Sequence, residues 1–283
     1  MSKIAILTDS SCDLPQELIE KYPIHVVPLR LIYQNGEYRD GVDITADEFY
    51  TKLEVEIPTT SMPSPQDLQE TFQQIEDQGF THVLAITISS GLSGTFNTFR
   101  LMAEDFPNLT VQMIDSKGLS WLLGYQVVEA AKLVQEGFRF DETIERIHQL
   151  QPEISGYFIV DTLDYLKRGG RIGSVTATLG SLLSLKPIIT VDGEGKFFSY
   201  RVARGKKQAL KKLMDIVEET IESTRAQIAV VHSKAKTEAE EFANRLRELE
   251  NVVVSSIGHI SPAMAVHTGP GMLGLIIQRE ENS

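Results

Sequence analysis

The sequence predicts an α/β protein made of two packed domains, with parallel-rich sheets flanked by helices. Short apolar runs typical of buried strands alternate with amphipathic stretches typical of helices, and this alternation is characteristic of a parallel sheet. The run His82–Ile88 is continuously apolar, as in a strand that is buried on both faces. The chain has 283 residues, which is enough for one large or two medium domains.

The first half of the chain reads as alternating strands and helices. Ile4–Leu7 predicts a strand, and Pro15 suits the first position of the helix that follows. Asn35-Gly36 is a strong hairpin signal, and Thr45 stands three residues before Glu48, as in a capping box. The other expected strands are Leu29–Tyr33, Glu37–Arg39, Val111–Asp115 and Tyr157–Val160, and the expected helices are Glu17–Lys21, Thr45–Leu53, Ser64–Asp77, Phe96–Asp105, Leu119–Gln135 and Thr143–Leu150.

The pattern changes after about residue 160, so we expect a boundary between domains 1–160 and 161–283. Leu163–Gly173 is rich in glycine and basic residues, and Asp192–Gly195 indicates a hairpin. Lys206–Ser223 is charged and amphipathic, as expected of a surface helix. A second strand–helix–strand set and a last strand follow, at Gln227–His232, Thr237–Leu249, Val252–Ile257 and Met272–Gln278.

The composition argues against several classes of protein. There are 27 basic and 39 acidic residues, and a net charge of −12 disfavours a general affinity for nucleic acid or anionic membrane. No apolar run approaches the ~20 residues of a membrane span, and no signal peptide is evident, so we expect a soluble cytoplasmic protein without stable membrane insertion. Cys12 is the only cysteine, which excludes an intramolecular disulfide and zinc sites built on cysteine pairs.

The segment Ser89–Thr95 (SSGLSGT) is the strongest candidate for a binding site. It stands between a predicted buried strand and a predicted helix, so its N–H groups and hydroxyls meet at the positive end of that helix. One hydroxyl alone would only cap the helix, but four hydroxyls and two glycines in seven residues favour an anion site. The hydroxyls belong to Ser89, Ser90, Ser93 and Thr95, and the glycines are Gly91 and Gly94.

An enzymatic interpretation of the same segment fits its spacing less well. A nucleophile elbow requires G-x-S-x-G, whereas Gly94 comes too early here and Thr95 stands where the second glycine belongs. A phosphate-binding loop requires a lysine after the glycines, and none follows. The alternative hypothesis is therefore an acyl hydrolase or transferase with Ser93 as nucleophile and His267 as base.

Two further segments carry candidate ligand-binding side chains. Thr59–Pro65 has more hydroxyls than a helix cap requires, next to two prolines that restrict the backbone, so we expect Thr60 or Ser61 to contact a ligand. His267 stands in a turn rich in glycine and proline before a predicted buried strand. A histidine held in this way can donate a hydrogen bond to a carboxylate near neutral pH.

Positive charge gathers in two stretches of this acidic chain. Lys167–Arg171 is one, and Arg201, Arg204, Lys206 and Lys207 form the other. Such clusters are typical either of a solvated surface or of a docking site for an acidic or phosphate-bearing partner. The residues themselves leave both interpretations open.

Taken together, these segments resemble the DegV family, which includes the FakB-type fatty-acid-binding proteins of bacteria. The resemblance covers nearly the whole chain, with six motifs in order, and Cys12 stands where an alanine is common in the family. The motifs are T-D-S-S-x-D-L-P at Thr8–Pro15, T-S-x-P-S at Thr60–Ser64, S-S-x-L-S-G-T at Ser89–Thr95, L-x-x-G-G-R-I at Leu166–Ile172, K-P-I followed by D-G at Lys186–Ile188 and Asp192-Gly193, and H-x-G-P-G at His267–Gly271.

The resemblance implies a two-domain α/β protein that buries a long-chain fatty acid, such as palmitate or oleate, between its domains. The carboxylate-binding threonine and serine of the family correspond to Thr60 and Ser93, and its nearby histidine corresponds to His267. Neither a metal nor a cofactor is implied. By the same resemblance, the corner around the carboxylate is lined by Ser61, Gly94 and Thr95.

The resemblance also implies a partner protein. FakB-type members present the acyl chain to a separate ATP-dependent fatty-acid kinase, which makes an acyl-phosphate for phospholipid synthesis, so the binding protein is a carrier and not an enzyme. Arg171 and Arg204 correspond to positions where the kinase docks. Candidates for the apolar lining, most of which we expect in the core, are Ile159, Leu182, Leu183, Ile188 and Met264.

Overall fold

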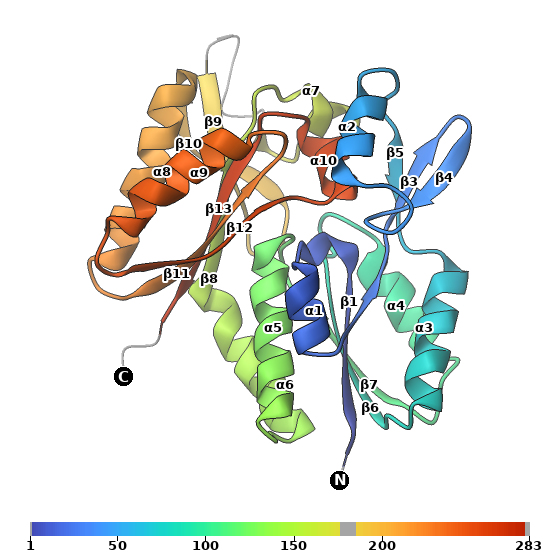
Figure 1. The fold of residues 1–283 in the computed structure, drawn as a ribbon. Coiled ribbons are helices and arrows are strands. Elements are labelled where there is room, and N and C mark those ends of the chain that lie inside the picture. The colour runs from blue at the N-terminus through green and yellow to red at the C-terminus, as the bar shows by residue number, and fades with distance from the viewer. Residues whose placement is uncertain (1, 176–184, 281–283) are drawn as a thin grey trace. The chain divides into compact units, whose positions relative to one another are not determined.

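The computed structural model describes residues 2–175 and 185–280, and it divides the chain into two compact units (Figure 1). The first unit comprises Met1–Pro152 with Ser261–Ala263, and the second comprises Glu153–Ile260 with Met264–Ser283. This division falls before the expected boundary at residue 160. The reason is that β8 (Ile154–Ile159) pairs with β13 (Leu273–Arg279) and so belongs to the sheet of the second unit.

The first unit is built on a four-stranded sheet, in the order β2-β1-β6-β7, in which all neighbours are parallel. Its strands are β2 (Ile24–Val27), β1 (Ile4–Asp9), β6 (His82–Thr87) and β7 (Thr110–Asp115). β6 is buried along nearly its whole length, which confirms the prediction from its apolar run. The chain leaves β1 toward one edge of the sheet and leaves β6 toward the other, so the crossover direction reverses between these two strands.

A three-stranded antiparallel sheet, in the order β4-β3-β5, belongs to the same unit. β3 (Arg30–Tyr33) and β4 (Gly36–Arg39) confirm the hairpin predicted at Asn35-Gly36. β5 (Thr59–Ser61) is a short strand in the segment that we expected to be a rigid loop, and it pairs with the other edge of β3. Thr60 and the segment that follows β6 are therefore attached to different sheets of one unit.

The helix starts in this unit follow the capping signals in the sequence. Thr45 Oγ1 accepts the Glu48 N–H at 3.3 Å, and Glu48 Oε2 accepts the Thr45 N–H at 2.9 Å, which confirms the capping box. Pro15 lies one position before the helix, at the N-cap. The helices are α1 (Gln16–Lys21), α2 (Ala46–Leu53), α3 (Pro65–Asp77), α4 (Thr95–Ala103), α5 (Trp121–Gln135) and α6 (Phe140–Leu150), with a 3-10 turn, η1, at Ser10–Cys12.

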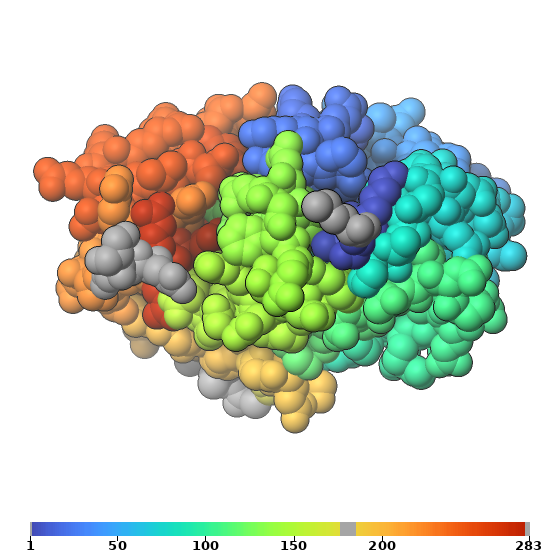
Figure 2. All heavy atoms as spheres, turned by 90° about the horizontal axis from the view of Figure 1, so that it is seen from below, coloured from blue at the N-terminus to red at the C-terminus, as the bar shows by residue number. Residues whose placement is uncertain are grey.

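Helices cover the parallel sheet through buried apolar side chains. Leu68 and Phe72 of α3 and Phe99 of α4 are fully buried and share a core cluster with Leu7 of β1. α5 packs against α6, and α6 forms part of the yellow-green surface in Figure 2. No helix within residues 2–175 and 185–280 is long and apolar enough to cross a membrane.

The second unit is built on a six-stranded mixed sheet, in the order β10-β9-β8-β13-β11-β12. β11 and β12 are parallel, and all other neighbouring strands are antiparallel. β13 lies between β8 and β11 and is antiparallel to both. Side chains of α8 and α9, including Leu213 and Phe242, are buried in a core cluster with this sheet. The remaining elements are η2 (Gln151–Glu153), α7 (Asp164–Arg168), β9 (Leu185–Val191), β10 (Phe197–Arg204), α8 (Gly205–Ile221), β11 (Ala226–His232), α9 (Lys236–Arg247), β12 (Val252–His259) and α10 (Pro262–Thr268).

Two aspartates attach residues 261–263 to the first unit. Asp13 Oδ1 accepts the Ser261 N–H at 2.8 Å, and Asp40 Oδ1 accepts the Ala263 N–H at 3.1 Å. Asp13 is partly exposed as a residue, but its Oδ2 is buried, and Asp40 is 2% exposed. Burial raises the pKa of Asp13 to about 7 and that of Asp40 to about 6, from an ordinary 3.8.

These raised pKa values predict a specific dependence of stability on pH. The folded protein retains a proton on Asp13 that the unfolded chain has already released, and it loses this proton as the pH rises through about 7. We therefore expect wild type to lose stability relative to Asp13→Asn between about pH 5 and pH 7, with a slope of up to about 1.4 kcal/mol per pH unit. The difference should level off above pH 7, because Asp13 is then ionised in both the folded and the unfolded state. Urea denaturation of both proteins across this range measures the difference.

Asp43→Asn provides the matched control. Hydrogen bonds from Arg39 lower the pKa of Asp43 to about 2, so its substitution has a constant effect over the same range. A difference between wild type and Asp13→Asn that stays constant, or that changes in favour of wild type as the pH rises, would contradict the assignment.

Candidate functional site

The Ser89–Thr95 segment begins at the carboxyl end of β6, beside the point where the crossover direction reverses. Ligands of open α/β sheets bind outside the carboxyl ends of the strands at this point. The fully buried Asp9, at the end of β1, uses Oδ2 to accept the Ile88 N–H at 2.8 Å and Oδ1 to accept the Ser11 N–H at 3.0 Å. One buried carboxylate therefore joins the two strand ends and fixes where the segment begins.

The four hydroxyls of this segment have different roles. Ser89 Oγ accepts the Gly91 N–H at 3.1 Å, and Ser90 Oγ donates to Asp115 Oδ2 at 2.5 Å. These two serines shape the loop, which differs from the expectation that four hydroxyls gather for an anion. Ser93 Oγ and Thr95 Oγ1 lie 2.8 Å apart at the first turn of α4.

The start of α4 places this hydroxyl pair at the positive end of a helix. Gly94 is the N-cap, and Ser93 Oγ accepts the Thr95 N–H at 3.3 Å. An anion near the first turn gains about 0.3–1 kcal/mol from the helix dipole. A hydrogen bond to a charged group adds about 1.5–3 kcal/mol. The pair is therefore suited to a small anionic group such as a carboxylate.

Met62 connects the Thr60 segment to the start of α4. Its Sδ lies over Gly94, 2.6 Å from the position that a Cβ would occupy, and Thr98 Oγ1 lies 3.1 Å from this sulfur. Thr60, two residues earlier, is half-buried, whereas Ser61 is exposed. The structure thus holds the strand that carries Thr60 against the helix that follows Ser93, a contact that no sequence motif indicated.

Arg30 fixes the other side of the same segment. Its guanidinium donates to Asp67 Oδ2 through Nε at 3.0 Å and to Ser64 Oγ through Nη2 at 3.0 Å. The Arg30 side chain is 16% exposed and that of Asp67 is 12% exposed, so this ion pair is largely shielded from water. Ser64 also caps α3 by accepting the Asp67 N–H at 3.1 Å. The backbone on both sides of Thr60 is therefore held in place.

His267 lies in the last turn of α10, so the expectation of an irregular turn at this residue was wrong. Pro262 begins the helix, as proline often does, and two alanines favour its continuation. The ring of His267 occupies the space next to Gly169 where a Cβ would lie. Burial and, to a smaller extent, the positive charge of Arg171 lower the pKa of His267 to about 4. The imidazole is therefore neutral at pH 7 and can donate one hydrogen bond.

The glycines after His267 are required by close packing in the second unit. Gly269 has φ +67° and lies against the ring of Tyr165, and Gly271 has φ +85° and lies against the carboxylate of Asp161. A side chain at either position would combine a left-handed backbone with a steric clash. The end of α10 is therefore held in one conformation.

Ion pairs occupy part of the predicted basic clusters. Arg201 forms two hydrogen bonds with Glu219, at 3.1 and 2.7 Å, and Lys206 Nζ contacts Glu238 at 2.7 Å. Arg204 is exposed, and its backbone N–H donates to a glutamine in the first turn of α8. Arg171 is half-buried and donates to the Gly169 carbonyl at 2.7 Å. Arg201 and Lys206 therefore have structural roles. Of the two predicted docking residues, Arg171 and Arg204, Arg204 is the more accessible.

The structure gives little support to the hydrolase or transferase alternative. Ser93 Oγ pairs with Thr95 Oγ1. A general base works best with a pKa near the working pH, whereas that of His267 is about 4. The low pKa of His267 therefore disfavours it as the base that would activate Ser93.

Two further chemistries lack a basis in the described residues. No group of three or more histidine, cysteine, aspartate or glutamate side chains within residues 2–175 and 185–280 is arranged to hold a metal ion. Cys12 is buried, and burial raises the pKa of its thiol, which disfavours the reactive thiolate. Among the expected lining residues, Ile159, Ile188 and Met264 are buried, while Leu182 and Leu183 lie outside the described residues.

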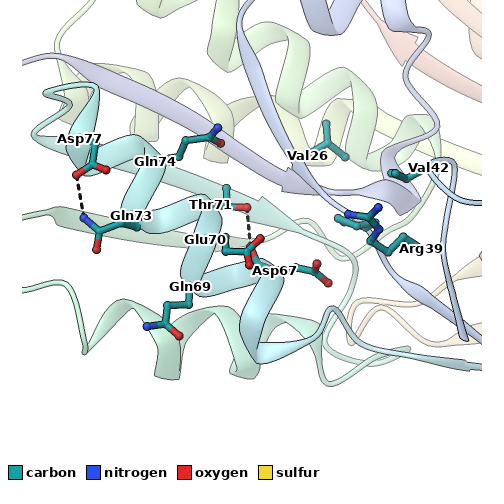
Figure 3. Close-up of a pocket in the computed structure, with 11 residues that line it drawn as sticks. Val26, Arg39, Val42, Asp67, Gln69, Glu70, Thr71, Gln73, Gln74 and Asp77 are labelled. Carbon is teal, nitrogen blue, oxygen red and sulfur yellow. Dashed lines mark hydrogen bonds between the residues drawn. The ribbon is translucent and has the colours of Figure 1, made fainter.

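A polar hollow of about 590 Å³ lies beside α3 in the first unit (Figure 3). Figure 3 shows glutamine and acidic side chains of α3 along it, with Gln73 bonded to Asp77. Walls of this kind suit water or a polar ligand better than an acyl chain. The lining residues are Val26, Pro28, Arg39, Val42, Asp67, Gln69, Glu70, Thr71, Gln73, Gln74 and Asp77.

Comparison with known proteins identifies whole-length relatives. The DegV family model, described as an uncharacterised protein family, matches residues 3–280. A DegV domain-containing protein from Clostridium acetobutylicum is 41% identical over 281 residues, which cover 99% of this chain and 100% of the relative. Another from Clostridium perfringens is 42% identical over 280 residues, with coverages of 99% and 100%.

Solved structures match over the same length. A fatty-acid-binding DegV family protein from Thermus thermophilus has a TM-score of 0.91 and 32% identity, covering 98% of this chain and 100% of that one. One from Streptococcus agalactiae has a TM-score of 0.89 and 33% identity, covering 100% of both chains. A stearic-acid-binding protein from Eubacterium ventriosum has a TM-score of 0.87 and 30% identity, covering 99% and 98%. With its family motifs in order and matches along its whole length, this chain belongs to the DegV family.

Proposed function

We propose that this protein is a cytoplasmic carrier that binds a long-chain fatty acid, such as palmitate or oleate, through hydrogen bonds from Thr60 and Ser93 to the carboxylate. The observation that carries the proposal is the hydroxyl pair of Ser93 and Thr95 at the start of α4, beside the reversal point of the sheet. The fatty-acid-binding relatives of known structure support the choice of ligand.

The chemistry of the proposed site suits a ligand that must be released again. Neutral hydroxyls and a helix start stabilise a carboxylate without a fixed positive charge. In the proposal, Ser61, Gly94 and Thr95 line the same corner and the neutral imidazole of His267 donates a further hydrogen bond. Burial of the acyl chain contributes about 0.8 kcal/mol per methylene, or on the order of 10 kcal/mol for sixteen carbons before the costs of binding.

The proposal extends to a partner enzyme. A carrier that holds a fatty acid by its carboxylate needs a second protein to activate that group, and we propose an ATP-dependent fatty-acid kinase that forms the acyl-phosphate for phospholipid synthesis. Arg171 and Arg204 are the proposed docking residues. Two points support this choice. Arg204 is exposed. The ligands of a kinase carry negatively charged phosphate groups, which arginine binds well.

Removal of the proposed carboxylate donors should weaken binding. We expect Thr60→Ala and Ser93→Ala each to lower the affinity for palmitate by about 1.5–3 kcal/mol, which is roughly tenfold or more, because each removes a hydrogen bond to a charged group. Isothermal titration calorimetry on delipidated protein measures the change. Thr110→Ala is the control, since Thr110 is exposed at the amino end of β7, away from the carboxyl ends of the parallel strands. Unchanged affinity in the Thr60→Ala, Ser93→Ala double variant would place the carboxylate elsewhere.

Reversal of the charge at the proposed docking surface should affect the kinase step alone. We expect Arg204→Glu to lower the rate of acyl-phosphate formation by added fatty-acid kinase and ATP, while the affinity for palmitate stays unchanged. Arg245→Glu, an exposed arginine of α9, is the matched control. Equal rates for both variants would reject Arg204 as a docking residue.

Turnover of an acyl ester or acyl-phosphate by the protein alone, lost in Ser93→Ala, would instead support the hydrolase or transferase.

A further inference from the structure

The two hydroxyls of the proposed carboxylate site are carried by separate parts of the first unit. Thr60 is in β5, which pairs with β3 in the antiparallel sheet. Ser93 follows β6, which belongs to the parallel sheet. A hydrogen bond weakens steeply once its atoms leave a narrow range of distance and angle. Two donors on different sheets can share one carboxylate only if something holds the spacing between them.

The β5 segment is firmly held on the side of its own sheet. Arg30 of β3 donates to Asp67 and Ser64 at the start of α3, and Arg30 stands opposite Ser61 in the strand register. These contacts fix the segment relative to β3 and α3. The packing of α3 against α4 places the segment near α4 as a whole. The contacts of Arg30 do not reach the start of α4, so the local distance between the segment and Ser93 depends on a nearer contact.

Met62 makes that contact across the two parts. Its Sδ lies over Gly94, and Thr98 Oγ1 is 3.1 Å from this sulfur and 3.2 Å from the Gly94 carbonyl oxygen. The hydroxyl of Thr98 has one hydrogen, so it donates to the sulfur or to the carbonyl, and either bond keeps it beside the start of α4. The thioether can approach so closely because residue 94 has no Cβ.

We propose that Met62 is a positioning residue that sets the spacing between the Thr60 and Ser93 hydroxyls by packing its thioether on Gly94. This inference rests on the proposed function, since it assigns a role within that carboxylate site. Methionine suits the role because its unbranched side chain adapts to an irregular surface and its sulfur accepts a weak hydrogen bond. Met62 is 39% exposed, so burial in a core does not hold it in place. Its contact with Gly94 positions it at the surface.

A double-mutant cycle on the full chain tests the role of Met62. We expect Met62→Ala to weaken palmitate binding by about tenfold in the wild-type background, within the range of coupling measured for contacting residues. In the Thr60→Ala background we expect less than about a twofold loss, because the hydroxyl that Met62 positions is already absent. Met62→Leu, which retains most of the packing, should restore most of the affinity.

Met102→Ala is the matched control, because Met102 lies on α4, the helix whose start Met62 contacts, and packs against the core cluster of the first unit. It should weaken binding equally in both backgrounds, if at all. Equal losses from Met62→Ala in the two backgrounds would overturn the inference while leaving the proposed function intact. Absence of palmitate binding by the wild type would overturn both.

A second measurement does not depend on the folding of Met62→Ala. In protein labelled with carbon-13 at its methionine methyl groups, palmitate should shift the Met62 signal in the wild type and shift it less in Thr60→Ala, with the Met102 signal as internal reference. An equal shift of the Met62 signal in both proteins would overturn the inference.

Discussion

The buried carboxylate of Asp9 holds together the ends of β1 and β6, and the candidate site depends on this arrangement. Asp9 accepts the Ile88 N–H at 2.8 Å and the Ser11 N–H at 3.0 Å, so both of its oxygens have backbone partners inside the protein. A buried carboxylate without such partners would cost several kcal/mol. The two strand ends are therefore bound to one position, at the point where the sheet offers its carboxyl ends to a ligand.

From this fixed point, each step toward the proposed site follows from local contacts. Ser90 is held by Asp115, which shapes the loop, and Ser93 and Thr95 then meet 2.8 Å apart at the start of α4. Met62 holds the Thr60 strand against the same helix. Such a site would stabilise a carboxylate with neutral donors alone, which is appropriate to a carrier because release needs no charged group to be separated.

Local sequence signals predict much of the fold, and long-range contacts account for what they miss. Apolar runs such as His82–Ile88 and turn signals such as Asn35-Gly36 act within a few residues, so they predict strands and hairpins well. The bond between Ser261 and Asp13 spans 248 positions, and no local pattern reports it. For the same reason the sequence does not show that residues 261–263 belong to the first unit.

Local sequence signals likewise predict only part of the candidate site. The count of hydroxyls in Ser89–Thr95 correctly marks a loop at the start of a helix, but it cannot show that Ser90 is used by Asp115, 25 positions away. Met62 stands at the variable position of T-S-x-P-S, so the motif draws no attention to it. The contact between its sulfur and Gly94 is a tertiary contact, which the motif does not report. Short-range patterns thus identified the segments, and tertiary contacts decide which side chains are available.

Carbon-13 NMR of palmitate labelled at its carboxyl carbon tests the central claim most directly. Bound to the wild-type protein, this carbon should give one resonance distinct from free palmitate. Hydrogen bonds to the charged form should keep it ionised to a lower pH than the free acid. The resonance should change its shift and its titration in both Thr60→Ala and Ser93→Ala. Absence of a bound resonance, or one that neither substitution alters, would contradict the account.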